Sequence, residues 1–339
     1  TGKSLIIDGK YADISFPPSA INISLLDNAG DNAWVKFAMD TISETDTEKV
    51  LADAAENDGK GLFAIGGRVF EFTCEIVAEN KTKAVTSFDT EVILTISLSN
   101  QDLAGIDADK LGVYRYNEAL KKWEYYGGHY DAKTNTIIFT TTHFSLYSVM
   151  EFKKTFTDIA AHWAKSEIEK MAAKHIARGY GNDLFKPDDT VTGAEFYIFM
   201  VRALELKEKG IVKMPAQDVK SGLWYYNELG IAFEVGIATV DDGAMFRPDV
   251  NITREEMAIA IARTLQIKLN IAVPTDQLTE KVLSKFNDHD KISNAAKESV
   301  AMAVQKNIIK GKPGAVFDPG TTATRAEAMT MIKRLLDLF

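Results

Sequence analysis

Two periods of hydrophobic and polar residues divide the chain. In the first half, short runs rich in aromatic and β-branched residues alternate with turn residues, which is typical of antiparallel strands. In the second half, apolar residues recur at helical spacing, which is typical of amphipathic helices. The period changes near residues 150–155. We therefore expect an N-terminal all-β, sandwich-like domain followed by an all-α region.

Five strand-like runs are clearest in the first half. They cover residues 69–77, 93–98, 112–116, 123–126 and 136–140. Polar residues up to Asn135 favour a hairpin that joins the last two runs. Cys74 lies in the first run and is expected to be a small core residue. We also expect two short helices in this half, over residues 50–56 and 103–111.

One short string occurs three times in the second half. Each copy holds Phe-x-Pro, and a Thr-x-x-Glu whose Glu follows the Phe by ten residues; an Ile precedes each Phe by nine. The spacing is fixed while the residues inside it vary, so we infer that the conformation of this loop is constrained. The three copies also indicate that one structural unit is repeated. Each repeat predicts two helices: 163–176 and 195–204, 224–237 and 256–265, 295–308 and 327–336. The linker 266–285 leaves room for a short helix.

Composition and charge limit the function classes. The 339 residues are 46% hydrophobic and 26% charged. Residues 1–150 hold 13 Lys+Arg against 22 Asp+Glu, and the remainder holds 26 of each. Nucleic acid, which requires a basic surface, is therefore not an expected partner. No apolar run is long enough for a membrane span. Because the chain starts at Thr1, we expect a processed or excised piece.

Each Thr-x-x-Glu has the spacing of a capping box, so we assign its Thr and Glu to the start of a helix. Arg254 and Arg325 directly follow the Thr, at the first helical position, where the helix dipole disfavours a cation. With the exposed first-turn amides, each would form an anion site suited to a carboxylate or phosphate. The alternative is a surface Arg paired with a nearby acid.

Aromatic and acidic residues mark the start of the first helix in two repeats. Trp163 and Trp224 each lie thirteen residues before the repeated Ile. Flat indole faces near a charged anchor can hold sugar rings, and core packing is the alternative. Asp158 and Asp218 precede the tryptophans, and we expect them to cap these helices.

Together these residues make the second half resemble the surface-layer homology (SLH) family. The likeness is carried by the series Phe156-Thr157-Asp158, His162-Trp163, Gly179-Tyr180-Gly181 and Phe185-Lys186-Pro187, and by Thr-Arg-Ala-Glu, in register. It implies SLH repeats at 156–205, 216–265 and 284–339, following a β domain at 1–150. It also implies a pseudo-threefold spindle with three prongs and a central three-helix bundle.

The resemblance implies a function as well. Such modules anchor exported bacterial proteins to secondary cell-wall polysaccharide, often through a pyruvylated N-acetylmannosamine-type residue; a peptidoglycan-associated glycan is a further candidate partner. Arg254 and Arg325 would bind the carboxylate. The remaining groove residues would be Asp158, Trp163, Gly179, Asp218, Trp224 and Gly311. The implied location is extracellular, at the cell wall or S-layer, with no cofactor, metal or catalysis.

Three positions of the family pattern are the Arg after the Thr, the loop Gly and the Trp of the first helix, and each repeat lacks one of them. Gly193 replaces Arg in repeat 1, Val240 replaces Gly in repeat 2, and Ala295 replaces Trp in repeat 3. No repeat is therefore intact. We expect one or two working grooves, centred on Arg254 and Arg325, and a weak or inactive one at Gly193.

Two other function classes remain open. Residues 88–150 resemble, less specifically, a β domain that often precedes SLH modules. His143 lies in this segment, and we interpret it as structural because no nucleophile or metal-ligating residue lies at a suitable spacing from it. The sequence has neither a zinc-protease motif nor a nucleophile elbow. The alternatives are a C-terminal fragment of a cell-surface enzyme, such as a polysaccharide hydrolase with catalysis outside this chain, and a self-assembling S-layer protein.

Overall fold

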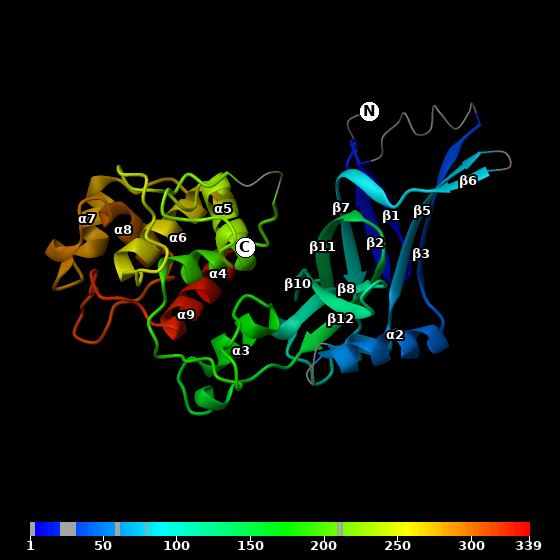
Figure 1. Cartoon of the computed structure of the whole chain (residues 1–339), viewed down its shortest axis with the longest axis horizontal. Coiled ribbons are helices and arrows are strands. Elements are labelled where there is room, and N and C mark those ends of the chain that lie inside the picture. Colours follow the sequence, from blue (N-terminus) through cyan, green and yellow to red (C-terminus); the bar gives the residue numbers. More distant parts are fainter. Residues whose placement is uncertain (1–3, 21–31, 58–61, 79–80, 209, 211–212) are drawn as a thin grey trace. The chain divides into compact units, whose positions relative to one another are not determined.

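The computed structural model divides the chain into two compact units, residues 1–154 and 155–339. It describes residues 4–20, 32–57, 62–78, 81–208, 210 and 213–339. The first unit is built mainly from strands, with one helix (α2), and the second from helices (Figure 1). The predicted order, β region before α region, is confirmed.

Two antiparallel sheets form the first unit in the described residues. The first sheet has the order β1 (Leu5–Asp8), β2 (Ala12–Phe16), β7 (Ser87–Ser97), β11 (Thr136–His143), β10 (His129–Asp131). The second has the order β3 (Trp34–Thr41), β5 (Phe70–Ala78), β12 (Leu146–Phe152), β8 (Leu111–Asn117), β9 (Lys122–Gly127), with β4 (Leu62–Ala64) on β12 and β6 (Lys81–Ala84) on β5.

Alternate residues of both sheets point into one core. Ile14 and Leu94 from the first sheet share this core with Phe72 and Val113 from the second, and all four are buried. This is the period-two pattern of sheets with one buried face. Cys74 is buried in the same core, as predicted.

Two sequence predictions in this unit need correction. Residues 103–110 form turns and one 3-10 turn (Ala108–Lys110), and Leu111 already begins β8, because Gly105 has φ of 75° and the Asp107 side chain accepts from the Asp109 amide. The turn ending near Asn135 joins β10 to β11, whereas the run 123–126 pairs with β8 in the other sheet. The helix at 50–56 is confirmed as part of α2 (Glu44–Asn57), where the Val50 carbonyl accepts from Trp123 Nε1 at 2.8 Å.

In its described residues, the second unit contains two α-helices per repeat, and α7 lies between repeats 2 and 3. The first helices are α3 (Lys165–Ala173), α5 (Tyr226–Val235) and α8 (Lys297–Gln305). The second helices are α4 (Gly193–Ala203), α6 (Arg254–Leu269) and α9 (Arg325–Leu336), and α7 is Asp276–Leu283. One hydrophobic core takes buried residues from all three repeats.

Each first helix ends in the same way. The residue just before the repeated Ile adopts the left-handed conformation: His175 at φ 54°, Gly236 at φ 87° and Asn307 at φ 58°. Such a residue typically ends a helix because it turns the chain away from the helical path. The repeated Ile then begins the loop, and all three copies are buried.

Candidate functional site

An aspartate holds the Phe-x-Pro loop in each repeat. The carboxylate of Asp158 accepts hydrogen bonds from the Phe185 amide at 2.9 Å and from the Lys186 amide at 2.7 Å. Burial opposes ionisation of Asp158, but these amide hydrogen bonds outweigh it and lower its pKa. Lys186 has φ of 60°, a costly conformation for a residue with a Cβ. The carboxylate therefore stabilises a strained loop.

The same arrangement occurs in the other two repeats. Asp218 accepts from the amides of Phe246 and Arg247, and Asp288 from those of Phe317 and Asp318. The prediction that Asp158 and Asp218 cap the first helices is wrong, because α3 and α5 begin without a side-chain cap. The sequence comparison missed Asp288. It lies 29 residues before its Phe, whereas Asp158 and Asp218 lie 27 and 28 residues before theirs, and repeat 3 has Ala295 in place of the Trp that follows the other two aspartates.

All three predicted capping boxes are present. In each, the Thr side chain accepts from the Glu amide and the Glu side chain accepts from the Thr amide, at Thr192/Glu195, Thr253/Glu256 and Thr324/Glu327. One oxygen of each Glu is used in this way. The other oxygen accepts from Arg325 in the case of Glu195 and from Arg254 in the case of Glu327.

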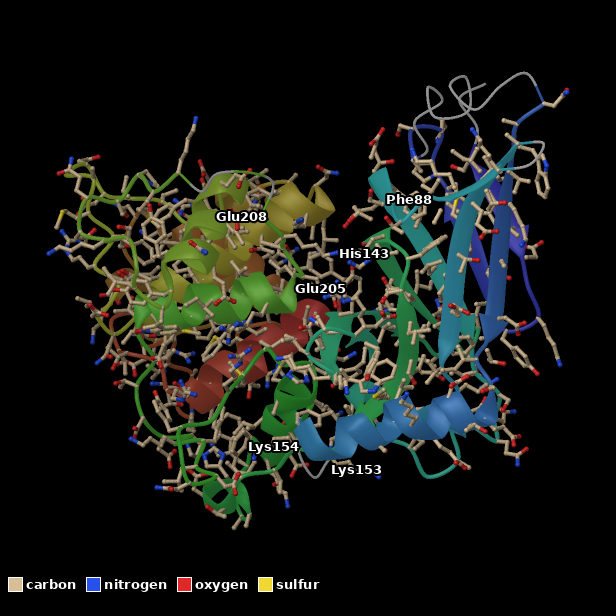
Figure 2. The ribbon with its side chains drawn as sticks, turned by 45° about the vertical axis from the view of Figure 1, so that its right-hand side comes forward. Phe88, His143, Lys153, Lys154, Glu205 and Glu208 are labelled. Atoms are coloured by element: carbon tan, nitrogen blue, oxygen red, sulfur yellow. The ribbon has the colours of Figure 1, made fainter. Side chains whose placement is uncertain are left out.

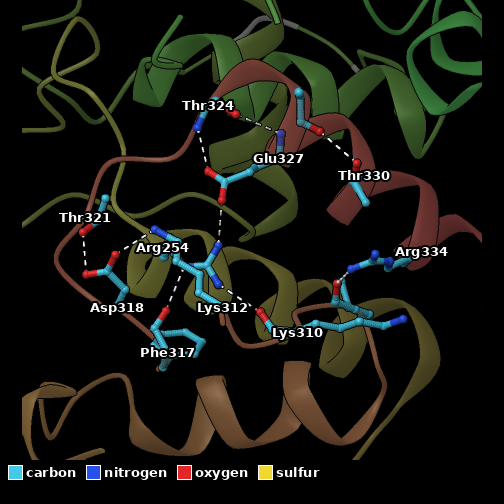
Figure 3. A network of polar contacts seen from close by, with 12 residues as sticks. Arg254, Lys310, Lys312, Phe317, Asp318, Thr321, Thr324, Glu327, Thr330 and Arg334 are labelled. Atoms are coloured by element: carbon cyan, nitrogen blue, oxygen red, sulfur yellow. Dashed lines mark hydrogen bonds and ion pairs between the residues drawn. The ribbon is translucent and has the colours of Figure 1, made fainter. Parts of the chain in front are cut away.

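Arg254 of repeat 2 reaches into repeat 3. Its Nε donates to the Phe317 carbonyl at 2.9 Å, Nη2 to the Lys310 carbonyl at 3.0 Å, and Nη1 to the Glu327 carboxylate at 3.2 Å (Figure 3). The side chain is 3% exposed. Burial lowers the pKa of Arg254 and the Glu327 carboxylate opposes the shift, while a guanidinium stays protonated in proteins. The cation therefore joins a loop and a helix start of the next repeat.

Arg325 of repeat 3 makes the equivalent contacts in repeat 1. Nε donates to the Phe185 carbonyl at 3.1 Å, Nη2 to the Arg178 carbonyl at 3.0 Å, and Nη1 to Glu195 at 3.0 Å. The guanidinium carbon lies 4.7 Å from the ring centroid of Tyr180. Tyr180 also donates its hydroxyl hydrogen bond to Glu195. Neither arginine is a surface residue with a free fork, and each is bound inside the following repeat.

Backbone hydrogen bonds link the repeats in the same order. The first two amides of each second helix donate to carbonyls of the next loop: Gly193 to Val250 and Ala194 to Pro248, Arg254 to Thr321 and Glu255 to Pro319, Arg325 to Asp189 and Ala326 to Pro187. The links run from repeat 1 to 2, from 2 to 3, and from 3 back to 1. We call them junctions 1–2, 2–3 and 3–1.

Junction 1–2 lacks the arginine. Gly193 occupies that position, and a Cβ built on it would have no neighbour closer than 3.8 Å. Glu256 is exposed, whereas the side chains of Glu195 and Glu327 are 16% and 23% exposed. Phe246 is half-buried, whereas Phe185 and Phe317 are fully buried. This junction is the most open of the three.

The two loop glycines are required by packing. A Cβ at Gly179 would lie 2.4 Å from the Phe156 ring, and one at Gly311 would lie 2.6 Å from the Phe286 ring. Repeat 2 has Ala216 at the position of these phenylalanines and Val240 at the position of the glycines. Both belong to the helical core. In repeat 2 the larger Val240 is therefore accompanied by the smaller Ala216, whereas the other repeats pair a Gly with a Phe.

The tryptophans lie on the surface. Trp163 is 63% exposed and Trp224 is 64% exposed, so neither belongs to the core. Trp163 packs beside His162, whose Nε2 lies 3.3 Å from Asp188 in the loop that receives Arg325. Ala295, at the equivalent position in repeat 3, is also exposed.

The β unit holds a buried polar cluster around His143, at the end of β11 (Figure 2). Its Nε2 lies 2.6 Å from Arg115 Nη1, and its Nδ1 faces the hydroxyls of Thr141 and Tyr147. Thr141 and Tyr147 are fully buried. These contacts connect β8, β11 and β12, so His143 links strands of the β unit, which agrees with a structural role. Within the described residues no group of three or more His, Cys, Asp or Glu could hold a metal ion.

No helix in the described ranges is both long and apolar enough to cross a membrane.

Comparison with known proteins agrees with the repeats. The family model of the S-layer homology domain matches residues 155–196, 217–258 and 285–329. The matched segments each hold one Phe-x-Pro loop and the start of one second helix.

Three relatives illustrate where similar sequences occur. Over 91% of its length, the chain is 35% identical to an amylopullulanase of Thermoanaerobacterium thermosulfurigenes, and the match covers 16% of that protein. It is 26% identical over 52% of its length to the surface-layer 125 kDa protein of Lysinibacillus sphaericus, covering 14% of that protein. It is 28% identical over 47% of its length to a cellulosome-anchoring protein of Acetivibrio thermocellus, covering 35% of it.

The chain therefore spans a minor part of each of these relatives. The amylopullulanase match covers both units, whereas the other two cover about half of the chain. With three family-model matches, three capping boxes and three copies of one loop, this chain belongs to the proteins that carry S-layer homology domains, with three such domains after a β-rich N-terminal domain.

Proposed function

We propose that this chain holds an exported protein at the bacterial cell wall by binding a secondary cell-wall polysaccharide at the junctions between its SLH repeats. The name of one relative, a cellulosome-anchoring protein, supports an anchoring role. The name of another, a surface-layer protein, supports a place at the cell surface. The cyclic order of the three junctions supports a pseudo-threefold spindle with the second helices at its centre.

One observation carries this proposal: Arg254 and Arg325 each bind inside the next repeat. The binding residues are therefore grouped by junction and not by repeat. The arginine of one repeat binds the Phe-x-Pro loop of the next repeat, so we group it with the loop glycine and the tryptophan of that next repeat. Counted in this way, junction 3–1 combines Arg325, Gly179 and Trp163. Junction 2–3 has Arg254 and Gly311 but Ala295 in place of Trp. Junction 1–2 has Trp224 but lacks both the arginine and the glycine.

This count ranks the three junctions. Junction 3–1 is complete and is the principal groove in our proposal, and junction 2–3 is a weaker groove without an indole face. Junction 1–2 contributes least, because it offers an exposed Glu256 where a pyruvate carboxylate would need a cation. The expectation of grooves centred on Arg254 and Arg325 is kept, with Arg325 as the stronger of the two.

In the principal groove each residue has a separate task. The exposed face of Trp163 would stack on a sugar ring, and Asp158 would keep the loop in its binding conformation. Arg325 uses three of the five guanidinium N–H groups on protein acceptors. Because the Arg325 side chain is only 3% exposed, it would attract the pyruvate carboxylate through its charge and not through a free fork. In repeat 2, Asp218 and Trp224 would act similarly but without the arginine.

Binding of the full chain to isolated cell walls tests this function. We expect saturable binding that purified secondary polymer competes away. Peptidoglycan from which that polymer has been removed should compete at least about tenfold less well, a difference of about 1.4 kcal/mol. Equal binding to stripped and intact walls would favour a peptidoglycan-associated glycan and contradict the proposed partner.

A second candidate concerns the whole protein. Because the 35% identity to an amylopullulanase extends across both units, the chain would be the surface-attachment part of an exported enzyme with catalysis outside these residues.

Sedimentation of the purified chain tests the remaining alternative, a self-assembling S-layer protein. An attachment part should stay a discrete species at micromolar concentration, whereas an S-layer protein should form sheets or large aggregates.

A further inference from the structure

At junctions 2–3 and 3–1 one set of acceptors binds a guanidinium. Each set contains the carboxylate of the capping Glu, the carbonyl of the loop Phe, and the carbonyl of the residue just before the loop Gly. The ring of the loop Phe lies against the cation in both sets, at 5.4 Å and 4.8 Å. Two copies in one molecule thus show what this constellation binds.

Repeat 2 contains the same acceptors without the arginine. They are the Glu256 carboxylate and the carbonyls of Phe246 and Thr239. One oxygen of Glu256 accepts from Thr253 in the capping box. No ion pair joins Glu256 to a Lys, Arg or His of the described residues, and its capping-box contacts are to Thr253. Arg263 of the same helix donates from Nη1 to the hydroxyl of Thr239 at 2.8 Å, so it contacts the side chain of that socket residue and not its carbonyl. We call these three residues the repeat-2 socket.

The socket is open to solvent and walled by rings. Glu256 is exposed and Phe246 is half-buried. The Tyr197 ring lies 5.4 Å from the Phe246 ring and is itself buried, so one side of the socket is closed by an aromatic wall. Arg325 likewise packs against several rings in its own socket, including that of Phe199. Gly193 leaves the space beside Phe246 without a side chain.

We propose that the repeat-2 socket binds a guanidinium group from outside the repeats, namely an arginine side chain of another polypeptide. An arginine is favoured over a lysine because the two filled sockets use Nε, Nη1 and Nη2 of a planar fork on three separate acceptors, which a single ammonium cannot reproduce. This site is independent of the wall polymer, since its ligand is a cation.

The test is an NMR titration of the ¹⁵N-labelled full chain with N-acetyl-L-arginine amide, matched against N-acetyl-L-lysine amide at constant ionic strength. We expect saturable shifts of the Thr239, Phe246 and Glu256 amides, with a Kd of about 1–10 mM. The lysine compound should bind at least about fivefold more weakly.

Three variants separate the socket from nonspecific binding. Gly193→Arg should abolish the shifts by filling the socket from within the chain, and Gly193→Ala should leave them unchanged. Glu256→Gln keeps a capping-box residue but removes the charge, so it should weaken binding at least about fivefold. Absence of saturable shifts in the wild-type chain, equal binding of both compounds, or unchanged binding to Gly193→Arg would overturn the proposal.

Discussion

The guanidinium of Arg325 donates to the carboxylate of Glu195 at 3.0 Å, although 130 residues separate them in the chain. Glu195 at the same time closes the capping box at the start of α4. A single carboxylate therefore completes a local helix start and joins the last repeat to the first. The Arg254–Glu327 pair does the same between repeats 2 and 3.

The first prediction concerns this pair. Arg325→Ala removes the cation that pairs with Glu195 and the donor to two backbone carbonyls, so we expect the free energy of unfolding of the helical unit to fall by about 3 kcal/mol. Urea denaturation followed by far-UV circular dichroism measures it. Arg334→Ala on the same helix, which removes one long hydrogen bond to Ile308, is the control and should cost less than about 1 kcal/mol. Equal losses would contradict a special role for Arg325.

The second prediction concerns the exchange of volume in repeat 2. Gly311→Val should destabilise the fold by about 2 kcal/mol, because its Cβ would overlap the Phe286 ring. Phe286→Ala should cost about 3 kcal/mol through the cavity it leaves. The double variant reproduces the Ala216/Val240 pair of repeat 2, so its cost should be smaller than the sum by at least about 1 kcal/mol. Additive costs in thermal and urea unfolding would show that the two positions are independent.

The third prediction concerns acid stability. Hydrogen bonds from Lys312 and Thr321 lower the pKa of Asp318. A carboxyl with a lowered native pKa stabilises the fold above its unfolded value, about 3.9, and this contribution is lost as the pH falls through the native pKa. Asp318→Asn should therefore cost less than about 1 kcal/mol at pH 7, and the difference from wild type should shrink below pH 4. Urea titrations at pH 7 and pH 3 compare the two proteins. A difference that grows on acidification would contradict the sign of this effect.

The fourth prediction separates binding from stability at the tryptophans. Because both indoles are exposed, Trp163→Ala and Trp224→Ala should each change the free energy of unfolding by less than about 1 kcal/mol. Their effects on polymer binding should differ: about tenfold weaker for Trp163→Ala, at the complete junction, and less than about threefold weaker for Trp224→Ala. Isothermal titration with purified wall polymer measures both. A larger loss for Trp224→Ala would reverse the proposed ranking of junctions.

The features that could be predicted from the sequence are local ones. A capping box needs only a Thr and a Glu three residues apart, and all three are present. The helical periods in the second half gave both helices of each repeat, and the short helix in the linker, because each amphipathic pattern lies within one element. The sequence predicts Asp158 and Asp218 at helix starts because a cap is the usual local use of an aspartate before a helix, whereas their partners lie in a distant loop.

The destination of an arginine side chain could not be predicted in this way. Arg254 and Arg325 stand at exposed-looking helix starts in the sequence, but their partners come from another repeat. Within single repeats, the departures at Gly193, Val240 and Ala295 leave no repeat intact. Assigning each arginine to the repeat it enters changes that result, and it identifies one junction with all three residue types.

The most direct measurement of the central claim is the affinity of the full chain for purified secondary wall polymer before and after chemical removal of its ketal pyruvate. If the junctions recognise the carboxylate, removal should weaken binding at least about tenfold, and the Trp163→Ala variant should bind both polymers weakly. If the wild-type chain binds the depyruvylated polymer with unchanged affinity, carboxylate recognition at these junctions is contradicted.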